Sequence, residues 1–433
     1  MRNMKKMMWM LVIVAISIGV FSVAVGQPLV SPEKVGLSSQ KLANIDKVVE
    51  QAIANKEIPG AVVLVARKGQ IAYLKAIGNA DDNRPYKTDD IFRIASMSKT
   101  ITAVAVMQLF ERGKILLTDP ISKYIPEFKN PKVASLDADG NIRYSPAKRE
   151  ITIHDLLSMS SGISSRAGGN EFLNKLAQVY KEIGLEDEMG PLDMTLEQYA
   201  KIVAKCPLAN HPGTVMDYSN AGANTLGYLV EVVSGMRFDQ YLDENIFKPL
   251  NMTDTMFFPA GPQLKRVVPP YYSGTLKKVT GLLDWGLRQV DYTYTTDKNR
   301  KFCNPSGGLH GTVYDYFRFG QMLVNYGQLD GVRVLGKESV KIMTSPVIVE
   351  PFFGNMWGYM FDIQAEVNGY SNPSFLNQGG KGAFGWLGFW GTKGTMNPDK
   401  ETVVVIYSQI FPFMAALPYQ QKITQVVNGA IID

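Results

Sequence analysis

The sequence predicts an α+β fold, in which one antiparallel sheet is built from both ends of the chain and is flanked by helices. Two observations support this prediction: strand-like runs occur near both termini, and the patterns between them are mainly helical. The chain has 433 residues, of which 45% are hydrophobic and 10% aromatic, so it can bury a large core. We expect residues 27–92 and 306–433 to form the sheet region, and residues 93–305 to form a mainly helical region with insertions.

The strand-like runs are separated by turn residues. Near the start, the sequence AVVLVARKGQIAYLKAIG predicts two strands joined at Lys68-Gly69. Near the end, GFWGTKGTM and TVVVIYSQ predict two more strands on either side of a turn at residues 397–399. A final helix is expected near residues 418–427.

Apolar residues at helical spacing occur before and between these runs. They predict a helix at residues 42–54 and others in ITIHDLLSMSSG, LEQYAKIVAK, NAGANTLGYLVEVVSG and VYDYFRFGQMLVNYG. Two less regular insertions, residues 130–149 and 259–305, are expected to be surface loops or walls of a pocket.

The first 26 residues have the pattern of a secretory signal. A cationic start is followed by an apolar stretch at residues 7–25 and by the small-residue site Ala24-Val25-Gly26. We therefore expect cleavage after Gly26 and a periplasmic or secreted protein. The alternative is an uncleaved membrane anchor, because the apolar stretch is longer than most signal cores.

Charge and motif content exclude several classes of function. The chain has 45 basic and 40 acidic residues, and three of the basic residues lie in the leader, so the remainder is nearly neutral. No basic patch predicts binding to nucleic acid. No metal-binding or nucleotide-binding motif is visible, so no cofactor and no metal are expected. The sequence does not predict the oligomeric state.

The stretch FRIASMSKTITAVAVMQLFERGKI contains Ser96 and Lys99 at the start of an apolar helical pattern, which Gly113 is expected to end. The two side chains are predicted to share one face of the first helical turn. A serine needs a base to become a nucleophile, and a buried lysine at a helix N-terminus can serve when its pKa is lowered. Ser-x-x-Lys recurs elsewhere, but only this copy opens an apolar helix.

Histidine, the usual base for a catalytic serine, is scarce in this chain. His154 lies in a helical pattern and His211 in a Pro-Gly turn, whereas His310, in GGLHGT, is kept as a candidate. No Gly-x-Ser-x-Gly motif occurs, which argues against the esterase fold with a serine, histidine and acid triad.

A second polar cluster, Tyr218-Ser219-Asn220, stands at the entry of another apolar helix after a Pro-Gly turn. A tyrosine beside an ammonium group can titrate at a lower pH and can act as a proton shuttle. The alternative for Ser96 and Lys99 is that they are only a helix cap and a solvated charge.

Together these motifs resemble the serine hydrolases that include class C β-lactamases, D-Ala-D-Ala peptidases and family eight esterases. The resemblance covers most of the chain after the leader and depends on FRIASMSKT, ITIHDLLSMSSGI, PGTVMDYSN and GGLHGTVYDYFRFGQMLVN. It implies a β-lactamase/transpeptidase-like fold. It also implies that Ser96 is the acylated nucleophile, that Lys99 and Tyr218 share the work of general base and acid, and that Asn220 orients the substrate.

The third motif of that family is Lys-Thr-Gly or His-Thr-Gly on a strand, about a dozen residues before an Asp-Pro turn. Counting back from Asn397-Pro398 gives Trp386-Leu387-Gly388, whereas esterase-like members carry Trp-Gly-Gly. The chain thus lacks the anchoring lysine of the β-lactamases. The resemblance implies an oxyanion hole made by the backbone N–H groups of Ser96 and Phe389. It also makes the third motif and His310 candidates for substrate binding.

The only two cysteines, Cys206 and Cys303, would lie in an exported chain, where disulfides persist. They could form a bridge between two segments that flank the pocket, or they could be two buried thiols.

The function expected from these features is an exported serine hydrolase that forms an acyl-enzyme on Ser96. Its substrate would be a small-molecule ester or amide, and most plausibly a small or apolar acyl ester, because Trp386 offers a neutral donor and an apolar face instead of a cation. The alternatives are an acyltransferase on the same site, a β-lactamase or D-Ala-D-Ala carboxypeptidase, and an inactive binding protein of the same fold. A stable membrane partner is expected only if the leader stays uncleaved.

Overall fold

The computed structural model describes residues 28–81, 84–164, 170–185, 194–280, 282–285, 288–291, 301–352, 355–364, 366–367, 370–371 and 379–433. The predicted leader therefore lies outside the described residues. Within them, no helix combines the length and the apolar character needed to cross a membrane.

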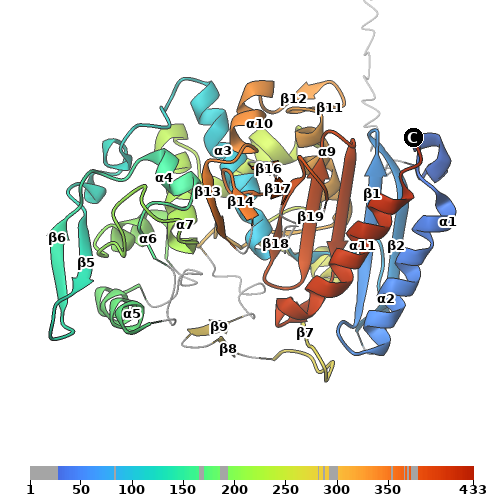
Figure 1. Ribbon diagram of the computed structural model, residues 1–433, viewed down its shortest axis with the longest axis horizontal. Coiled ribbons are helices and arrows are strands. Elements are labelled where there is room, and N and C mark those ends of the chain that lie inside the picture. Colours follow the sequence, from blue (N-terminus) through green and yellow to red (C-terminus); the bar gives the residue numbers. More distant parts are fainter. Residues whose placement is uncertain are drawn as a thin grey trace, which may run out of the picture.

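One antiparallel sheet of nine strands dominates the fold, in the order β13-β14-β15-β18-β19-β20-β1-β2-β3 (Figure 1). Its strands are β1 (Gly60–Arg67), β2 (Gln70–Asp81), β3 (Arg84–Pro85), β13 (Ile348–Phe352), β14 (Asn355–Trp357), β15 (Asp362–Ile363), β18 (Phe384–Gly388), β19 (Thr392–Asn397) and β20 (Thr402–Tyr407). Strand β1 pairs with β20, with Val62 opposite Tyr407. The prediction of a sheet formed by both ends of the chain is thus confirmed.

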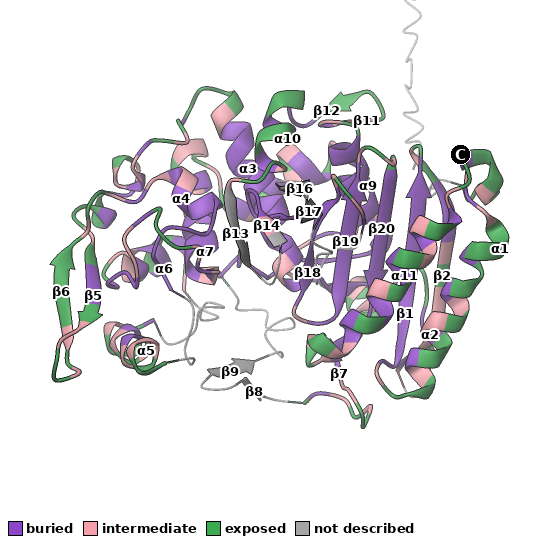
Figure 2. Cartoon of the chain, viewed as in Figure 1, coloured by how far each residue is buried: buried purple, intermediate pink, exposed green. Residues whose placement is uncertain are grey.

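Helices cover both faces of this sheet. They are α1 (Ser39–Leu42), α2 (Asn44–Ala54), α3 (Ser98–Glu111), α4 (Ile153–Leu157), α5 (Glu171–Ile183), α6 (Leu196–Val203), α7 (Asn220–Ser234), α8 (Phe238–Leu242), α9 (Val313–Val324), α10 (Lys337–Met343) and α11 (Leu417–Ala430). Figure 2 shows the central strands as buried and the outer sides of α2 and α11 as exposed. The helices expected from apolar periodicity are all present.

Side chains of β1 alternate between two core clusters. Val62 and Leu64 belong to the larger cluster, which includes residues of α3, α7 and α9. Ala61 and Val63 belong to the smaller cluster, together with residues of α2 and α11. The sheet therefore has two covered faces, and the helical region lies on the side of the larger cluster.

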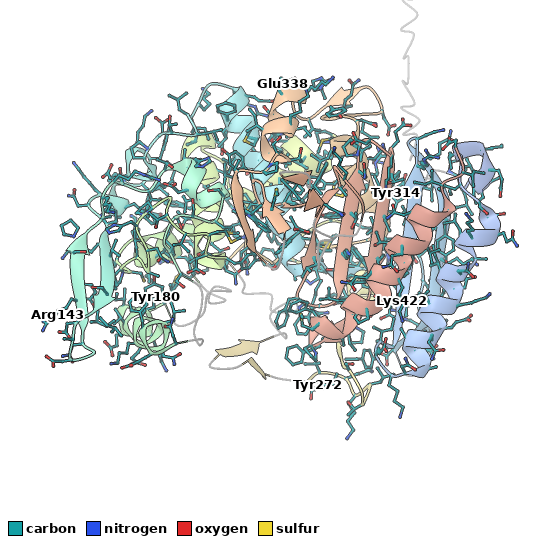
Figure 3. All side chains as sticks on the ribbon, in the orientation of Figure 1. Arg143, Tyr180, Tyr272, Tyr314, Glu338 and Lys422 are labelled. Carbon is teal, nitrogen blue, oxygen red and sulfur yellow. The ribbon has the colours of Figure 1, made fainter. Side chains whose placement is uncertain are left out.

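The insertions contain short strands. Residues 130–149 form a surface hairpin of β5 (Lys132–Leu136) and β6 (Ile142–Pro146), and Arg143 lies at the edge of the molecule (Figure 3). The second insertion includes β7 (Tyr271–Tyr272), β8 (Leu282–Trp285) and β9 (Arg288–Asp291). The other short strands are β4 (Phe92–Arg93), β10 (His310–Gly311), β11 (Gln328–Leu329), β12 (Val332–Arg333), β16 (Glu366–Val367), β17 (Tyr370–Ser371) and β21 (Ile410–Phe411).

Helix α4 begins with a capping box that also binds an arginine. The Thr152 side chain accepts a hydrogen bond from the Asp155 backbone, and the Asp155 carboxylate accepts one from the Thr152 N–H at 2.8 Å. Arg149 donates to the same buried carboxylate at 2.8 Å. Burial raises the pKa of Asp155, but the bonds from Arg149 and Thr152 outweigh it and hold the pKa below its ordinary value of 3.8.

We predict that Asp155→Ala lowers the free energy of unfolding by about 2 to 4 kcal/mol at pH 7, because a cap and charge-assisted hydrogen bonds are lost together. The folded pKa lies below the unfolded value, so this contribution disappears as the pH falls through the folded pKa. Urea unfolding of the wild type and Asp155→Ala at pH 7 and pH 3 measures this difference in the free energy of unfolding. The matched control is Gln198→Ala in the neutral capping box of α6, for which about 1 kcal/mol or less is expected. Equal losses in the two variants would contradict the electrostatic account.

Candidate active site

Ser96 lies on a short 3₁₀ turn, Ala95–Met97, which leads directly into α3 at Ser98. Sequence analysis places Ser96 within the first turn of the helix, and the structure puts it one tight turn earlier. Ala95 has a φ of +45°, a left-handed conformation that is unusual for a residue other than glycine. The Ser98 hydroxyl donates to the Ala95 carbonyl at 2.7 Å and so fastens this turn to the start of the helix. The strained residue next to Ser96 holds the hydroxyl at the entry of α3.

Lys99 is fully buried, and its amine is surrounded by oxygen atoms. Its Nζ lies 2.7 Å from Asn220 Oδ1, 2.6 Å from the Ser306 carbonyl oxygen and 3.2 Å from Ser96 Oγ. The first two oxygens can only accept, so they take two N–H groups. In the neutral amine the lone pair is then left for the Ser96 hydroxyl, which is the arrangement that a general base requires.

Tyr218 stands beside both groups, on the loop before α7. The Lys99 Nζ lies 4.7 Å from the centre of the Tyr218 ring. Burial raises the pKa of Tyr218 to about 12, although hydrogen bonds with Ser96 and Trp386 oppose it. Sequence analysis allows a neighbouring cation to lower this pKa, but in the structure burial has the larger effect and the pKa lies above its ordinary value of 10. At neutral pH the side chain is a neutral phenol.

The segment just after α4 holds the loop that carries Tyr218 in place. The Asp217 N–H donates to the Met159 carbonyl at 2.7 Å, and the Ser219 hydroxyl accepts from the Gly222 N–H at 3.0 Å to cap α7. Helix α4 and the residues that follow it thus position the tyrosine motif.

Trp386 comes to this cluster from strand β18. Its Nε1 lies 3.4 Å from the Tyr218 hydroxyl, and the two rings have centroids 5.6 Å apart. Trp357 packs edge-on against Trp386 with a centroid distance of 4.6 Å. Sequence analysis missed Trp357, whose neighbourhood gave no recognisable motif. Trp386 of the third motif and Trp357 therefore form an aromatic wall beside Tyr218.

Gly388, at the end of β18, lies against the backbone just before Ser96. A Cβ atom on Gly388 would be 2.4 Å from the Ile94 carbonyl oxygen and 2.2 Å from Thr392 Oγ1, so only glycine fits. This close approach brings the strand end to the turn of Ser96. The oxyanion hole formed by the N–H groups of Ser96 and Phe389 stays a prediction, and so do the binding roles of Leu387 and Gly388.

His310 is buried on β10, which pairs with β4 just before the nucleophile turn. Its backbone N–H donates to the Met256 carbonyl at 2.7 Å. The histidine backbone therefore supports the segment that leads to Ser96, and a role for its ring stays a prediction.

The Ser306 carbonyl is a site component that sequence analysis missed. Asn224 and Asn304 both accept hydrogen bonds from the Ser306 N–H at 2.9 Å, and this fixes the peptide that faces Lys99. A backbone oxygen leaves no residue-type signal. The turn-forming sequence NPSGG was the only available indication.

Cys206 and Cys303 are both buried free thiols, so the possible bridge is not formed in the structure. Cys206 Sγ lies 3.6 Å from the Ile202 carbonyl oxygen, one turn back along the chain. Burial raises the pKa of each thiol to about 12, which makes both poor nucleophiles.

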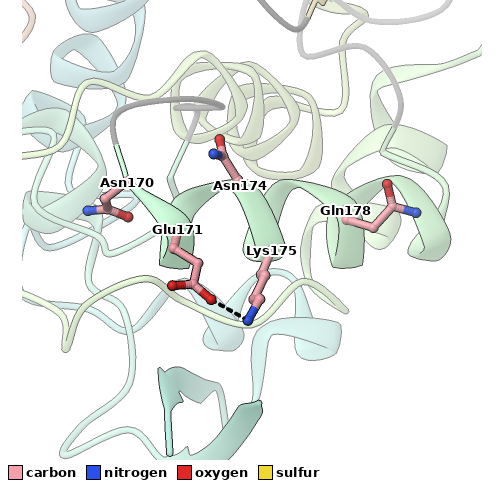
Figure 4. A pocket seen from close by; sticks show the side chains of 5 residues that line it. All are labelled: Asn170, Glu171, Asn174, Lys175 and Gln178. Carbon is pink, nitrogen blue, oxygen red and sulfur yellow. Dashed lines mark hydrogen bonds and ion pairs between the residues drawn. The ribbon is translucent and has the colours of Figure 1, made fainter. Parts of the chain in front are cut away.

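A hollow of about 700 Å³ lies along helix α5, and none of its lining residues belongs to the cluster around Ser96 (Figure 4). Its described lining consists of polar residues of that one helix and its N-cap: Asn170, Glu171, Asn174, Lys175 and Gln178. Glu171 and Lys175 form an ion pair at 2.6 Å. In the described part of the chain, no group of three or more His, Cys, Asp or Glu side chains could hold a metal ion.

Comparison with known proteins agrees with this geometry. The family model described as beta-lactamase matches residues 45–425. Protein Rv1367c of Mycobacterium tuberculosis is 30% identical over 368 residues, which cover 82% of this chain and 86% of that protein. Esterase EstB of Burkholderia gladioli is 35% identical over 234 residues, which cover 54% of this chain and 55% of the esterase.

A solved structure has the same fold. EstCE1, described as a hydrolase with promiscuous acyltransferase activity, aligns with a TM-score of 0.74 at 24% identity, over 90% of this chain and 98% of its own. The family match spans the sheet, the helical region and every residue of the cluster around Ser96. The chain therefore belongs to the β-lactamase family of serine hydrolases.

Proposed function

We propose that this protein is an esterase that acts on small or apolar acyl esters through an acyl-enzyme on Ser96. The observation that supports it most directly is the Lys99 amine, which is held by two acceptors and lies 3.2 Å from the Ser96 hydroxyl. The similarity to esterase EstB agrees with this reaction class. We also propose that the protein is exported, on the basis of its N-terminal pattern.

The arrangement supports a two-step reaction. Neutral Lys99 takes the proton of Ser96 as Oγ bonds to the acyl carbon, and the carbonyl oxygen becomes an oxyanion held by backbone N–H groups. When the ester C–O bond breaks, the leaving alcohol takes a proton from Tyr218, which Lys99 then reprotonates. Water attacks the acyl-enzyme with the same groups in reverse roles, which releases the acid and restores Ser96.

The proposed substrate class follows from Trp386. Its indole has one N–H donor, and this donor already faces the Tyr218 hydroxyl at 3.4 Å. A substrate carboxylate would find no cation at this strand position and would lose a charge-assisted hydrogen bond worth roughly 1.5 to 3 kcal/mol. An apolar acyl or alcohol group would instead pack against Trp386 and Trp357.

A second candidate is acyl transfer on the same site, in which an alcohol or amine takes the acyl group instead of water. EstCE1, which shares the fold, is described as having such promiscuous activity. Turnover of the cephalosporin and penicillin class, or of D-Ala-D-Ala peptides, is a weaker candidate because the anchoring cation is replaced by Trp386.

We predict that Ser96→Ala and Lys99→Ala each abolish formation of the covalent acyl adduct, because one removes the nucleophile and the other its base. Intact-mass measurement after exposure to acyl donors detects the adduct. Lys75→Ala, at an exposed lysine on β2, is the control and should acylate normally. Wild-type turnover by Lys99→Ala would rule out the lysine mechanism, and a comparable collapse in His310→Ala would point to a histidine base instead.

Tyr218→Phe should lower kcat by about 10² to 10⁴, the range for loss of one general acid or base. Tyr359→Phe is the matched control. Burial also raises the Tyr359 pKa to about 12, but its hydroxyl is hydrogen-bonded to His154 Nδ1 at 2.6 Å. The control should lose less than about tenfold. Equal losses in the two variants would mean that the effect is one of packing.

Substrate preference provides a further prediction. The ratio of kcat/KM for a nitrophenyl acyl ester to kcat/KM for a chromogenic cephalosporin should be high in the wild type. In Trp386→Lys it should fall by about 10-fold or more, because a cation restores the missing bond to the carboxylate. A wild-type enzyme that strongly prefers the cephalosporin would overturn the assignment as an esterase.

A further inference from the structure

Lys393 is a second buried lysine, and the reaction proposed above makes no use of it. Its side chain lies on β19 and is only 2% exposed. Within the described part of the chain, its Nζ has no hydrogen-bond partner. Burial of an amine without hydrogen bonds is unfavourable, so a purely structural position would be better filled by an apolar residue.

Strand register places this amine directly behind the active site. Lys393 lies opposite Leu387 on β18 and opposite Ile406 on β20. Ile406 belongs to the core cluster that includes α2 and α11, and because side chains alternate along a strand, Lys393 lies on that side of the sheet, whereas Trp386 faces Tyr218 on the other side. Lys393 therefore cannot touch a substrate at Ser96, but it contacts the strand that forms one wall of the site.

The residue before Lys393 connects the same strands to the nucleophile turn. Thr392 lies opposite Gly388, and its hydroxyl donates to the Ile94 carbonyl at 3.3 Å. The Gly388 backbone approaches the same carbonyl. A shift of β19 relative to β18 would therefore change the position of the Phe389 N–H with respect to Ser96.

A small cavity lies beside the amine. It is lined by Asp362, Gly385, Trp386, Leu387, Lys393, Gly394 and Thr395. Gly385 lies between Asp362 on β15 and Thr395 on β19, and it approaches β19 so closely that a Cβ atom would be 2.0 Å from the Gly394 carbonyl oxygen. The cavity volume of about 10 Å³ leaves room for one water molecule and for no larger ligand.

The charge on Lys393 depends on its surroundings. Burial lowers the pKa of the amine to about 8, and the nearby Asp362 carboxylate opposes this change. Leu387 and Ile406, the cross-strand neighbours, are apolar, and Thr395 has no titratable group in this range. Lys393 is therefore mostly positive at neutral pH and becomes neutral as the pH rises through about 8.

We propose that Lys393 and Asp362 form a buried charge pair across the back of β18 that positions the end of this strand, and with it the Phe389 N–H, for the reaction at Ser96. This inference rests on the proposed function. Lys393 acts through the strand and is thus a positioning residue. The two charges attract across Gly385 of β18, and this attraction holds β15, β18 and β19 in one arrangement.

The test compares Lys393→Met and Asp362→Asn with the wild type, using any ester that acylates Ser96. We expect Lys393→Met to lower kcat by about 10- to 100-fold, because a small displacement of an oxyanion donor is costly. KM should change by less than about twofold, because the residues that contact the substrate are unchanged. The matched controls are Lys75→Met and Asp46→Asn, an ion pair between exposed Lys75 on β2 and partly buried Asp46 on α2, and both should leave kcat unchanged.

The pH profile distinguishes positioning by charge from simple packing. The wild-type kcat should fall as the pH rises through about 8, and Lys393→Met should lack this step. Asp362→Asn should move the step to lower pH, because the carboxylate raises the lysine pKa. Thermal unfolding checks that each variant is folded. If Lys393→Met does not fold, the inference is tested by Asp362→Asn alone, through the shift of the alkaline step in kcat to lower pH.

Two results would overturn the inference: an unchanged kcat in folded Lys393→Met, or an alkaline step that stays in place in Asp362→Asn. Failure of the proposed function would be recognised by a different result: the Ser96→Ala variant would retain wild-type turnover. In that case the reaction does not take place at Ser96, and the inference fails together with the proposed function.

Discussion

The site depends on one buried amine that is held by oxygen atoms from three distant parts of the chain. Ser96 comes from the turn before α3, Asn220 from the start of α7, and the Ser306 carbonyl from the segment before β10. A buried amine needs such partners, because an uncompensated polar group in the core is unfavourable. Lys99 can therefore be buried only if α3, α7 and the Ser306 turn come together around its amine. The same packing brings together the groups that would react.

Loss of water shapes the chemistry of this cluster as much as its contacts do. Tyr218 lies between the amine and the two tryptophans, and burial keeps its hydroxyl protonated. In such surroundings electrostatic interactions are stronger than in water, so the interactions among Ser96, Lys99 and Tyr218 are strengthened. Burial beside the aromatic wall thus keeps Tyr218 a neutral phenol at neutral pH.

Most of the fold could be predicted from the sequence, because apolar periodicity is strong at both ends and in the helices. Ser96, Lys99 and Tyr218-Ser219-Asn220 could also be located, since each stands where an apolar helix begins. Three features could not be predicted. The Ser306 carbonyl is backbone, Trp357 belongs to no motif, and the Tyr218 pKa depends on burial that only tertiary packing creates. The two cysteines show the same limit, because spacing in the sequence does not determine the distance between two thiols.

The pairing of β1 with β20 affects how the chain reaches its native state. Strands β1 and β2 can form a hairpin early, since only the turn at Lys68-Gly69 separates them. The other edge of β1 pairs with β20, at residues 402–407, which lies far along the chain. Such non-local pairing is slow and leaves an apolar edge exposed in the meantime. Helices α2 and α11, which pack together over the same face, come from opposite ends of the chain as well. The sheet and its α2/α11 layer are therefore completed only when β20 and α11 are available, and a growing chain is vulnerable to aggregation until then.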